Sequence, residues 1–317
     1  MRGVLKKISF SENFTPKVLD AMIHLTAPPA VAKPEPVGRT ISPTYEEAPA
    51  EETLFEKAAP RGEGKPTPAR DANRMTIGGI ELVKIPKGSF LMGSKDDNEL
   101  TYDSEKPQHS VDIPYDFWMA RFILTNELYA QHLGDKKHPV SDWKKKRDHP
   151  VVNVSWDDAM AYCKWFNENF KSELGDLLLR LPTEAEWEKA ARGAYANEWP
   201  WGNEFDPKKC NSSEGGIKST TPVGAYSSLG GDSPYGCADV AGNVWEWTHT
   251  LFMKYPYEVN DGREAEDIRE RRVLRGGSFL NDRRLARCAY RYYDYPSSRN
   301  LYLGFRVCVL PHHISGI

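Results

Sequence analysis

Cysteine and histidine are the residues of this chain best suited to metal or redox chemistry, and neither type is arranged for it. The five cysteines are scattered, without a CxxC pair or a cysteine–histidine cluster: Cys163, Cys210, Cys237, Cys288 and Cys308. The eight histidines form no HxxxH or HxxE arrangement. We therefore expect neither a structural zinc site nor a disulfide framework, but the reduced thiols of a cytosolic protein.

The charge balance and the N-terminus restrict the class of partner. Lysine and arginine number 42 against 45 acidic residues, which gives a net charge of −3. Proteins that bind nucleic acids usually carry a basic excess, so direct nucleic-acid binding is not expected. No apolar run approaches the ~20 residues of a membrane span, and the first residues lack the apolar core of a secretory signal. These features predict a cytoplasmic protein, while display on a cell surface or a phage particle stays open.

Proline content divides the chain into two regions. Residues 1–75 hold ten of the 23 prolines and no tryptophan, whereas all nine tryptophans lie between Trp118 and Trp247. A segment of this composition buries too little apolar surface to offset its chain entropy. We predict a largely disordered arm over 1–75 and one folded domain over 76–317.

Local patterns predict a mixed set of elements in that domain. Residues 79–86 and 89–92 are typical of strands on either side of a turn. Residues 155–170 and 183–192 have helical periodicity, and each follows a serine or threonine that can cap a helix. The chain after Gly193 is rich in glycine, serine and aromatic residues, which favours long loops attached to a small sheet.

Eight motifs occur in an order that is characteristic of one family. Between about Met75 and Val309 the chain contains IPKGSFLMGS, EKPQHSVDIP, HPVVNVSWDDAMAYCKWF, RLPTEAEWEKAARGA, WPWGNEF, PVGAYSSLGGDSPYGCADVAGNVWEWT, LRGGSF and LGFRV. This series resembles the formylglycine-generating-enzyme, or sulfatase-modifying factor, domain family. The resemblance implies an α+β protein with the divergent C-type-lectin-like fold of that family, including much ordered irregular loop.

The enzymatic activities of the family require ligands that this chain lacks. The oxidase uses two cysteines after the RGGS motif to bind copper, and the corresponding positions are Asn281 and Ala286. Cys288 matches a different cysteine of the family. The related iron sulfoxide synthases place histidine ligands in an added N-terminal bundle, whereas only His24 precedes Thr76 here. The resemblance thus implies a protein without copper, although an oxidoreductase with an altered metal site is the alternative.

Residues 275–306, which we call the variable window, are similar to the variable region of diversity-generating-retroelement proteins. In that group, mutated adenines turn AAC codons into other codons ending in C, which exclude Lys, Glu, Gln, Met and Trp. Aligned on RGGS and GFR, the window matches without gaps. None of the fifteen variable positions holds an excluded residue: Leu280, Asn281, Asp282, Arg284, Leu285, Tyr290, Tyr292, Tyr293, Asp294, Tyr295, Ser297, Ser298, Asn300, Leu301 and Tyr302.

The composition of the fifteen variable positions is that of a binding surface. They comprise five Tyr, three Leu and pairs of Asn, Asp and Ser, with one Arg. Tyrosine provides contact area at low entropic cost, and serine and asparagine add adaptable hydrogen bonds. YRYYDY lacks the aliphatic neighbours and the alternation of a buried strand. We therefore expect these tyrosines on one exposed face, and we expect Phe279, Ala289, Leu303 and Phe305 to be buried. Arg287 and Arg291 should bond to fixed carboxylates or carbonyls of the domain.

The family resemblance also implies calcium. By position, Asp239 and Glu246 would supply carboxylates, and Gly242 and Val244 would supply backbone carbonyls. Hydrogen bonding of the two carboxylates to loop amides is the alternative. A second family site would fall at Asn211, Ser212, Gly215 and Ile217, where glycine stands at the position of a family aspartate.

Together these observations predict a non-enzymatic variable protein. It would recognise a protein or another macromolecular ligand through its exposed window. An oxidoreductase of the formylglycine-generating type is the second interpretation, and a scaffold without a ligand is the third.

Overall fold

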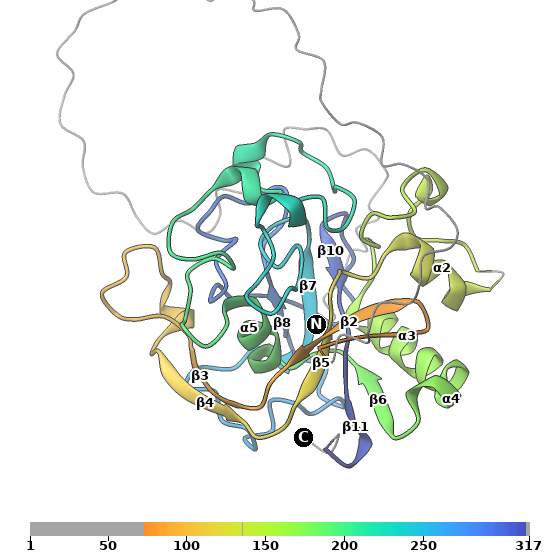
Figure 1. Ribbon diagram of the computed structural model, residues 1–317, viewed down its shortest axis with the longest axis horizontal. Coiled ribbons are helices and arrows are strands. Elements are labelled where there is room, and N and C mark those ends of the chain that lie inside the picture. Colours follow the sequence, from red (N-terminus) through yellow and green to blue (C-terminus); the bar gives the residue numbers. More distant parts are fainter. Residues whose placement is uncertain (1–72, 135, 315–317) are drawn as a thin grey trace, which may run out of the picture. The chain divides into compact units, whose positions relative to one another are not determined.

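The computed structural model describes residues 73–134 and 136–314, so nearly all of the predicted disordered arm, 1–75, lies outside the described residues. The described chain folds into α+β structure with three sheets (Figure 1). The first strand, β1, spans Arg74–Ile77, so regular structure begins two residues before the predicted domain start at 76.

The largest sheet is antiparallel and runs in the order β1-β2-β5-β11-β6. Its further strands are β2 (Ile80–Ile85), β5 (Phe117–Ala120), β6 (Leu177–Arg180) and β11 (Cys308–Pro311). The strand β11 near the C-terminus lies between β5 and β6, so this sheet joins both ends of the domain.

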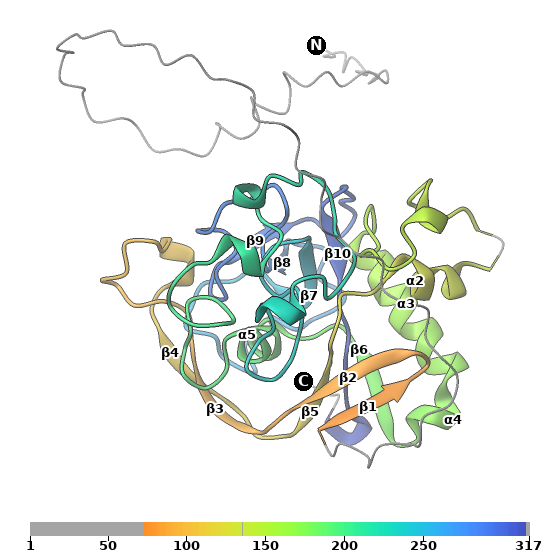
Figure 2. The same ribbon diagram turned by 45° about the horizontal axis from the view of Figure 1, so that its top comes forward.

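A four-stranded sheet in the order β10-β7-β8-β9 carries the variable window (Figure 2). It consists of β7 (Trp245–Leu251), β8 (Arg272–Arg275), β9 (Tyr292–Asp294) and β10 (Leu303–Phe305). The window leaves the end of β8, returns as the edge strand β9 and ends beyond β10, which pairs in parallel with β7. The expected small sheet with long loops is therefore present.

Two predictions about strands need correction. The predicted strands 79–86 and 89–92 exist, but they do not pair with each other. Strand β3 (Gly88–Met92) pairs with β4 (His109–Ile113), whereas β2 pairs with β1 and β5. The tyrosine segment does contain a strand, β9. The sequence lacks the usual apolar alternation of a strand here, because the inward position just before β9 is occupied by a buried arginine, Arg291.

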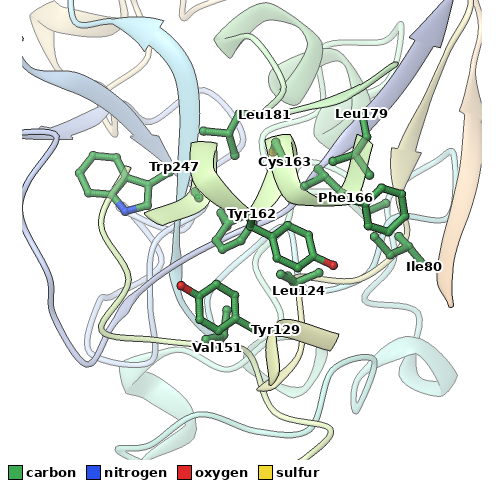
Figure 3. Packing of buried hydrophobic residues seen from close by; sticks show 14 of the residues in the cluster. Ile80, Leu124, Tyr129, Val151, Tyr162, Cys163, Phe166, Leu179, Leu181 and Trp247 are labelled. Atoms are coloured by element: carbon green, nitrogen blue, oxygen red, sulfur yellow. The ribbon is translucent and has the colours of Figure 1, made fainter. Parts of the chain in front are cut away.

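Two of the helices in the described chain begin where the sequence indicates capping residues. The helices are α2 (Asn126–Leu133), α3 (Trp156–Asn169), α4 (Lys171–Leu174) and α5 (Glu184–Arg192). Ser155 caps α3 and Thr183 caps α5, each in a capping box. The Tyr162, Cys163 and Phe166 side chains of α3 join Ile80 and Leu124 in the main core (Figure 3).

The helix α5 is more deeply buried than its sequence suggests. Trp187 and Ala190 are buried as predicted, but so is every other residue of the helix, including Glu184, Glu188 and Arg192. Charged groups cost several kcal/mol to bury unless they are paired. Glu184 and Glu188 pair with arginines of the variable window, as described below, whereas Glu186 pairs with Arg180.

Candidate recognition surface

The variable window alternates between accessible and buried residues along its whole length. None of the fifteen variable positions is buried, and Leu280, Tyr292, Tyr295 and Leu301 are among the most exposed large apolar side chains described. Of the other window residues, only Arg283 and Arg299 are exposed. We call the fifteen buried ones the frame positions: 275–279, 286–289, Arg291, Pro296 and 303–306.

The frame positions include the four apolar residues predicted to be buried. Phe279, Ala289, Leu303 and Phe305 are all at most 3% exposed. A glycine of the frame makes a close approach that a larger residue would prevent. Gly277 has a φ of +76°, and a Cβ there would lie 2.9 Å from the Leu285 carbonyl oxygen. The accessible positions are thus attached to a backbone that other residues hold.

Buried ion pairs fix the arginines of the frame. Arg287 donates to Glu105 through Nη1 at 2.8 Å and Nη2 at 2.6 Å, and its Nη1 also donates to Glu198 at 2.9 Å. Arg291 donates to Glu184 through Nε at 2.6 Å and Nη2 at 2.8 Å. These bonds confirm the expectation that both arginines reach carboxylates of the surrounding domain.

Electrostatics favours the charged form of this buried network. Burial alone would raise the pKa of Glu184, but the guanidinium groups of Arg291 and Arg275 outweigh it and lower the pKa below its ordinary value. Arg275 also pairs with Glu188, another buried acid of α5. The helix α5 therefore acts as an acidic anchor for the window.

An aromatic cluster runs across the accessible side of the window. Trp245 of β7 lies beneath it, with its ring centroid 5.7 Å from that of Tyr290 and 5.3 Å from that of Tyr292. Tyr292 in turn stacks on Tyr293 at 5.6 Å. Contiguous aromatic area of this kind on a folded domain is typical of an interaction site.

The accessible tyrosines are not equally exposed. Tyr292 is 41% and Tyr295 is 49% exposed, whereas Tyr290, Tyr293 and Tyr302 are half-buried. Tyr290 and Tyr302 also pack one side against the main core, together with Leu285. Tyr290, Tyr302 and Leu285 therefore contribute both to the accessible surface and to core packing, a double role that the sequence did not indicate.

The accessible aromatic surface also includes residues outside the variable window, which no pattern in the sequence indicates. Tyr102 contacts Tyr290 edge-to-face at a centroid distance of 5.2 Å. Phe252 contacts Tyr293 at 4.5 Å, and the Arg271 guanidinium lies 4.6 Å from the Tyr293 ring centroid. No spacing in the sequence relates these residues to the window, because the fold alone brings them together.

The positions of the copper ligands in the oxidase offer no thiolate pair. Ala286 is buried in an apolar cluster, and Asn281 uses its side-chain oxygen to accept hydrogen bonds from Ser278. Cys288 is buried near this segment, and burial raises the pKa of its thiol to about 12. Among the described residues, no group of three or more His, Cys, Asp or Glu side chains is placed to hold a metal.

The first predicted calcium set fits calcium only in part. Asp239 is buried, accepts a hydrogen bond from the Gly224 amide at 2.6 Å and forms no ion pair with a described residue. Burial raises the pKa of Asp239 to about 6, so a cation would compensate its charge. Glu246 is already compensated, because both of its oxygens accept from Arg306 and one also accepts from Trp187.

The second predicted set lies beside the first. The Asn211 backbone accepts a hydrogen bond from the Asn243 amide at 2.8 Å, and Gly242 allows this approach because a Cβ there would lie 2.2 Å from the Asn211 carbonyl oxygen. Within the described residues, the buried Asn211 Oδ1 and Ser212 Oγ have no hydrogen-bond partner. These oxygens suit a hard cation, but Gly215 brings no carboxylate and Ile217 is exposed.

Comparison with known proteins identifies the family. The model of the sulfatase-modifying factor enzyme 1-like domain matches residues 69–310. The formylglycine-generating enzyme of Streptomyces coelicolor is 37% identical over 71% of this chain and 87% of its own. The protein named inactive C-alpha-formylglycine-generating enzyme 2 of Bos taurus is 36% identical, over 72% and 87% of the two chains.

Solved structures show the same fold. PvdO from Pseudomonas aeruginosa matches 73% of this chain and 95% of its own, with a TM-score of 0.61 and 25% identity. Treponema denticola variable protein 1 matches 74% and 97%, with a TM-score of 0.59 and 22% identity. The expected α+β fold is thereby confirmed, and the chain belongs to the family of sulfatase-modifying factor enzyme 1-like domains.

Proposed function

We propose that this protein is a non-enzymatic, ligand-binding variable protein of a diversity-generating retroelement. It recognises its target through the fifteen variable positions. One observation carries the proposal: all fifteen positions are accessible, whereas fifteen of the seventeen residues between and beside them are buried. Positions that tolerate extensive substitution must lie outside the core, because core changes cost about 2–5 kcal/mol and a domain has only about 5–15 kcal/mol of stability to lose.

The contacts of the frame support the proposal further. The backbone of the window is anchored to the rest of the domain by arginine–glutamate pairs and by buried apolar residues, whereas variable side chains such as Asn281 bond it only locally. A new side chain at a variable position would therefore leave most of these contacts intact. Treponema denticola variable protein 1, whose name records its variability, has a similar fold, and this likeness supports the proposal.

Membership of the family does not decide between binding and catalysis. Relatives of similar identity include both a formylglycine-generating enzyme and a protein named as an inactive one. Two thiolates are needed to bind copper as the oxidase does, and Asn281 and Ala286 provide none. An oxidoreductase with a different metal site is the second candidate, and its support is the identity to the enzymes.

A pair of libraries tests the proposal. One library randomises the fifteen variable positions with codons ending in C, and the matched library randomises the fifteen frame positions in the same way. We expect most members of the first library to resist proteolysis like the parent and most members of the second to be degraded. Selection of the first library on a purified probe protein such as lysozyme should then enrich binders.

Equal loss of folded members from both libraries would contradict the proposal, and so would failure to enrich any binder. The gene provides an independent test. A reverse-transcriptase gene next to an Asn-rich near-copy of codons 275–306 is expected in its genomic neighbourhood.

We also propose that calcium binds at the loop before β7. Asp239 would hold it with carbonyl oxygens of Gly242 and Val244, and the Asn211 side chain lies beside this loop. The support is that, among the described residues, the buried Asp239 carboxylate forms no ion pair and the Asn211 Oδ1 has no hydrogen-bond partner. The ion would compensate a buried charge and so stabilise the loop.

A further inference from the structure

The recognition surface continues beyond the segment that diversification can change. We propose that Tyr102 and Arg271 are fixed members of this surface and that its partner is a folded protein. This inference rests on the proposed function, because it assigns residues and a partner class to the same surface. It adds that every variant of the protein presents a constant pair of contacts beside the variable ones.

Tyr102 reaches the surface from a segment far away in the sequence. Its ring is 38% exposed and meets Tyr290 at a centroid distance of 5.2 Å, while the Arg284 guanidinium lies 5.4 Å from its centroid. Tyrosine with this exposure offers both an apolar ring and a hydroxyl to a partner.

Frame arginines hold the backbone beside Tyr102 in place, although its ring contacts two variable residues. The adjoining turn η1 (Asp103–Glu105) is docked by Arg287, which pairs with Glu105, and by Arg291, whose Nη1 donates to the Ser104 carbonyl at 2.9 Å. Because neither arginine is a variable position, the place of the Tyr102 backbone does not depend on the residues at those positions. A constant contact residue has to meet this condition.

Arg271 occupies the opposite part of the aromatic cluster. Its guanidinium lies 4.6 Å from the Tyr293 centroid and 5.6 Å from the Tyr295 centroid. The Phe252 amide donates to the Arg271 carbonyl at 2.8 Å, which fixes this backbone without any variable side chain. Arg271 is exposed, and arginine beside tyrosine is the combination most enriched at the energetic centres of protein interfaces.

The chemistry of the whole surface favours a protein partner. Exposed leucines, Leu280 and Leu301, lie among the variable positions together with the tyrosines. Aliphatic side chains do not stack on sugar rings or bases, but they pack against the apolar side chains of another protein. Asp282 and Asp294 offset two of the three arginines Arg271, Arg283 and Arg284, and Arg299 pairs with Asp158, so the surface lacks the large basic excess that a polyanion requires.

The test uses window variants of the full chain that are selected independently on a purified protein, lysozyme. Tyr102→Ala and Arg271→Ala are introduced into several such binders, and affinity is measured for each. We expect both substitutions to weaken most binders by about tenfold, whatever their variable residues are. Matched controls at exposed sites elsewhere, Tyr195→Ala and Arg147→Ala, should change affinity by less than about twofold.

Tyr102→Phe separates contact from folding, because it keeps the ring and should retain most of the affinity. An unchanged melting temperature for every variant shows that the loss arises at the interface. Binders that tolerate Tyr102→Ala and Arg271→Ala would overturn this inference and leave the proposed function standing. Enrichment on immobilised dextran but not on lysozyme would overturn the protein partner, and no enrichment at all would overturn both proposals.

Discussion

Arg291, between two accessible tyrosines, forms a buried bidentate ion pair with Glu184 at the start of α5. Its Nε donates to Oε1 at 2.6 Å and its Nη2 donates to Oε2 at 2.8 Å. The flanking residues Tyr290 and Tyr292 face the other way, toward Trp245 and the surface. One inward arginine thus orients the most aromatic part of the variable window.

The Arg291–Glu184 pair should be essential for stability. Arg291→Ala leaves the Glu184 carboxylate buried with Arg275 as its nearest remaining cation, so we expect a loss of about 3–5 kcal/mol in the free energy of unfolding. The matched control is Arg299→Ala, which removes the more exposed pair with Asp158 and should cost less than about 1 kcal/mol. Urea denaturation of the three proteins measures both values, and similar losses would argue against the anchoring role.

The outer tyrosines should be dispensable for folding. The double substitution Tyr292→Ala and Tyr293→Ala removes an accessible stack, and we expect it to cost less than about 2 kcal/mol. Phe305→Ala, within the same window but fully buried, should cost about 3–5 kcal/mol. Thermal and chemical unfolding of both variants test the contrast. A larger loss from the tyrosine pair would mean that these rings belong to the core.

Calcium should stabilise the protein through Asp239. At a calcium concentration a hundredfold above Kd we expect a gain of about 2.7 kcal/mol, seen as a higher melting temperature that a chelator reverses. Asp239→Asn should abolish the gain, while Asp157→Asn, at a carboxylate paired with Arg269, should retain it. A melting temperature that is insensitive to calcium and to chelator in the wild-type protein would refute the calcium proposal.

Stability should decrease as the pH rises above 6.5 because of His249. Burial opposes protonation of this imidazole, but hydrogen bonds from Nδ1 to Glu264 at 2.9 Å and from Nε2 to Glu266 at 3.0 Å outweigh it and raise the pKa above 6.5. The folded state therefore binds the proton more tightly than the unfolded state. Its stabilisation is present below pH 6.5 and is lost as the pH rises through the raised pKa.

His249→Gln should flatten this part of the pH profile, by at most about 1.4 kcal/mol per pH unit. His149 provides the control, because burial lowers its pKa, so His149→Gln should alter the profile only below pH 6.5. Urea denaturation over a pH series measures both. An unchanged slope above pH 6.5 in His249→Gln would show that this histidine is not the titrating group.

The protein should not produce formylglycine. With Cu(I), oxygen and a sulfatase peptide containing cysteine, we expect no turnover above a control without enzyme, because Asn281 and Ala286 cannot bind copper as thiolates. Mass spectrometry of the peptide detects the product. The Streptomyces coelicolor relative, assayed in parallel, serves as a positive control, and turnover by this chain would favour the oxidoreductase interpretation.

The sequence by itself determined those elements that depend only on neighbouring residues. Ser155 and Thr183 cap α3 and α5 because each side chain bonds an amide within its own first turn. The order of the motifs indicated the fold through its resemblance to a known family. Alignment of the window on RGGS and GFR with a known variable region indicated which of its positions are accessible. Each of these inferences needed only neighbouring residues or a match of the chain's motifs to those of a known family.

The tertiary structure alone decided which distant residues meet. Arg287 and Glu105 are 182 positions apart, and Arg291 and Glu184 are 107 apart, yet both pairs are buried contacts. Glu184 and Glu188 of α5 look like solvent-exposed helix residues in the sequence, because Arg291 and Arg275 meet them only when the window folds over the helix. Tyr102 and Arg271 join the recognition surface for the same reason: contacts across such separations depend on how sheets and loops pack, which no local pattern encodes.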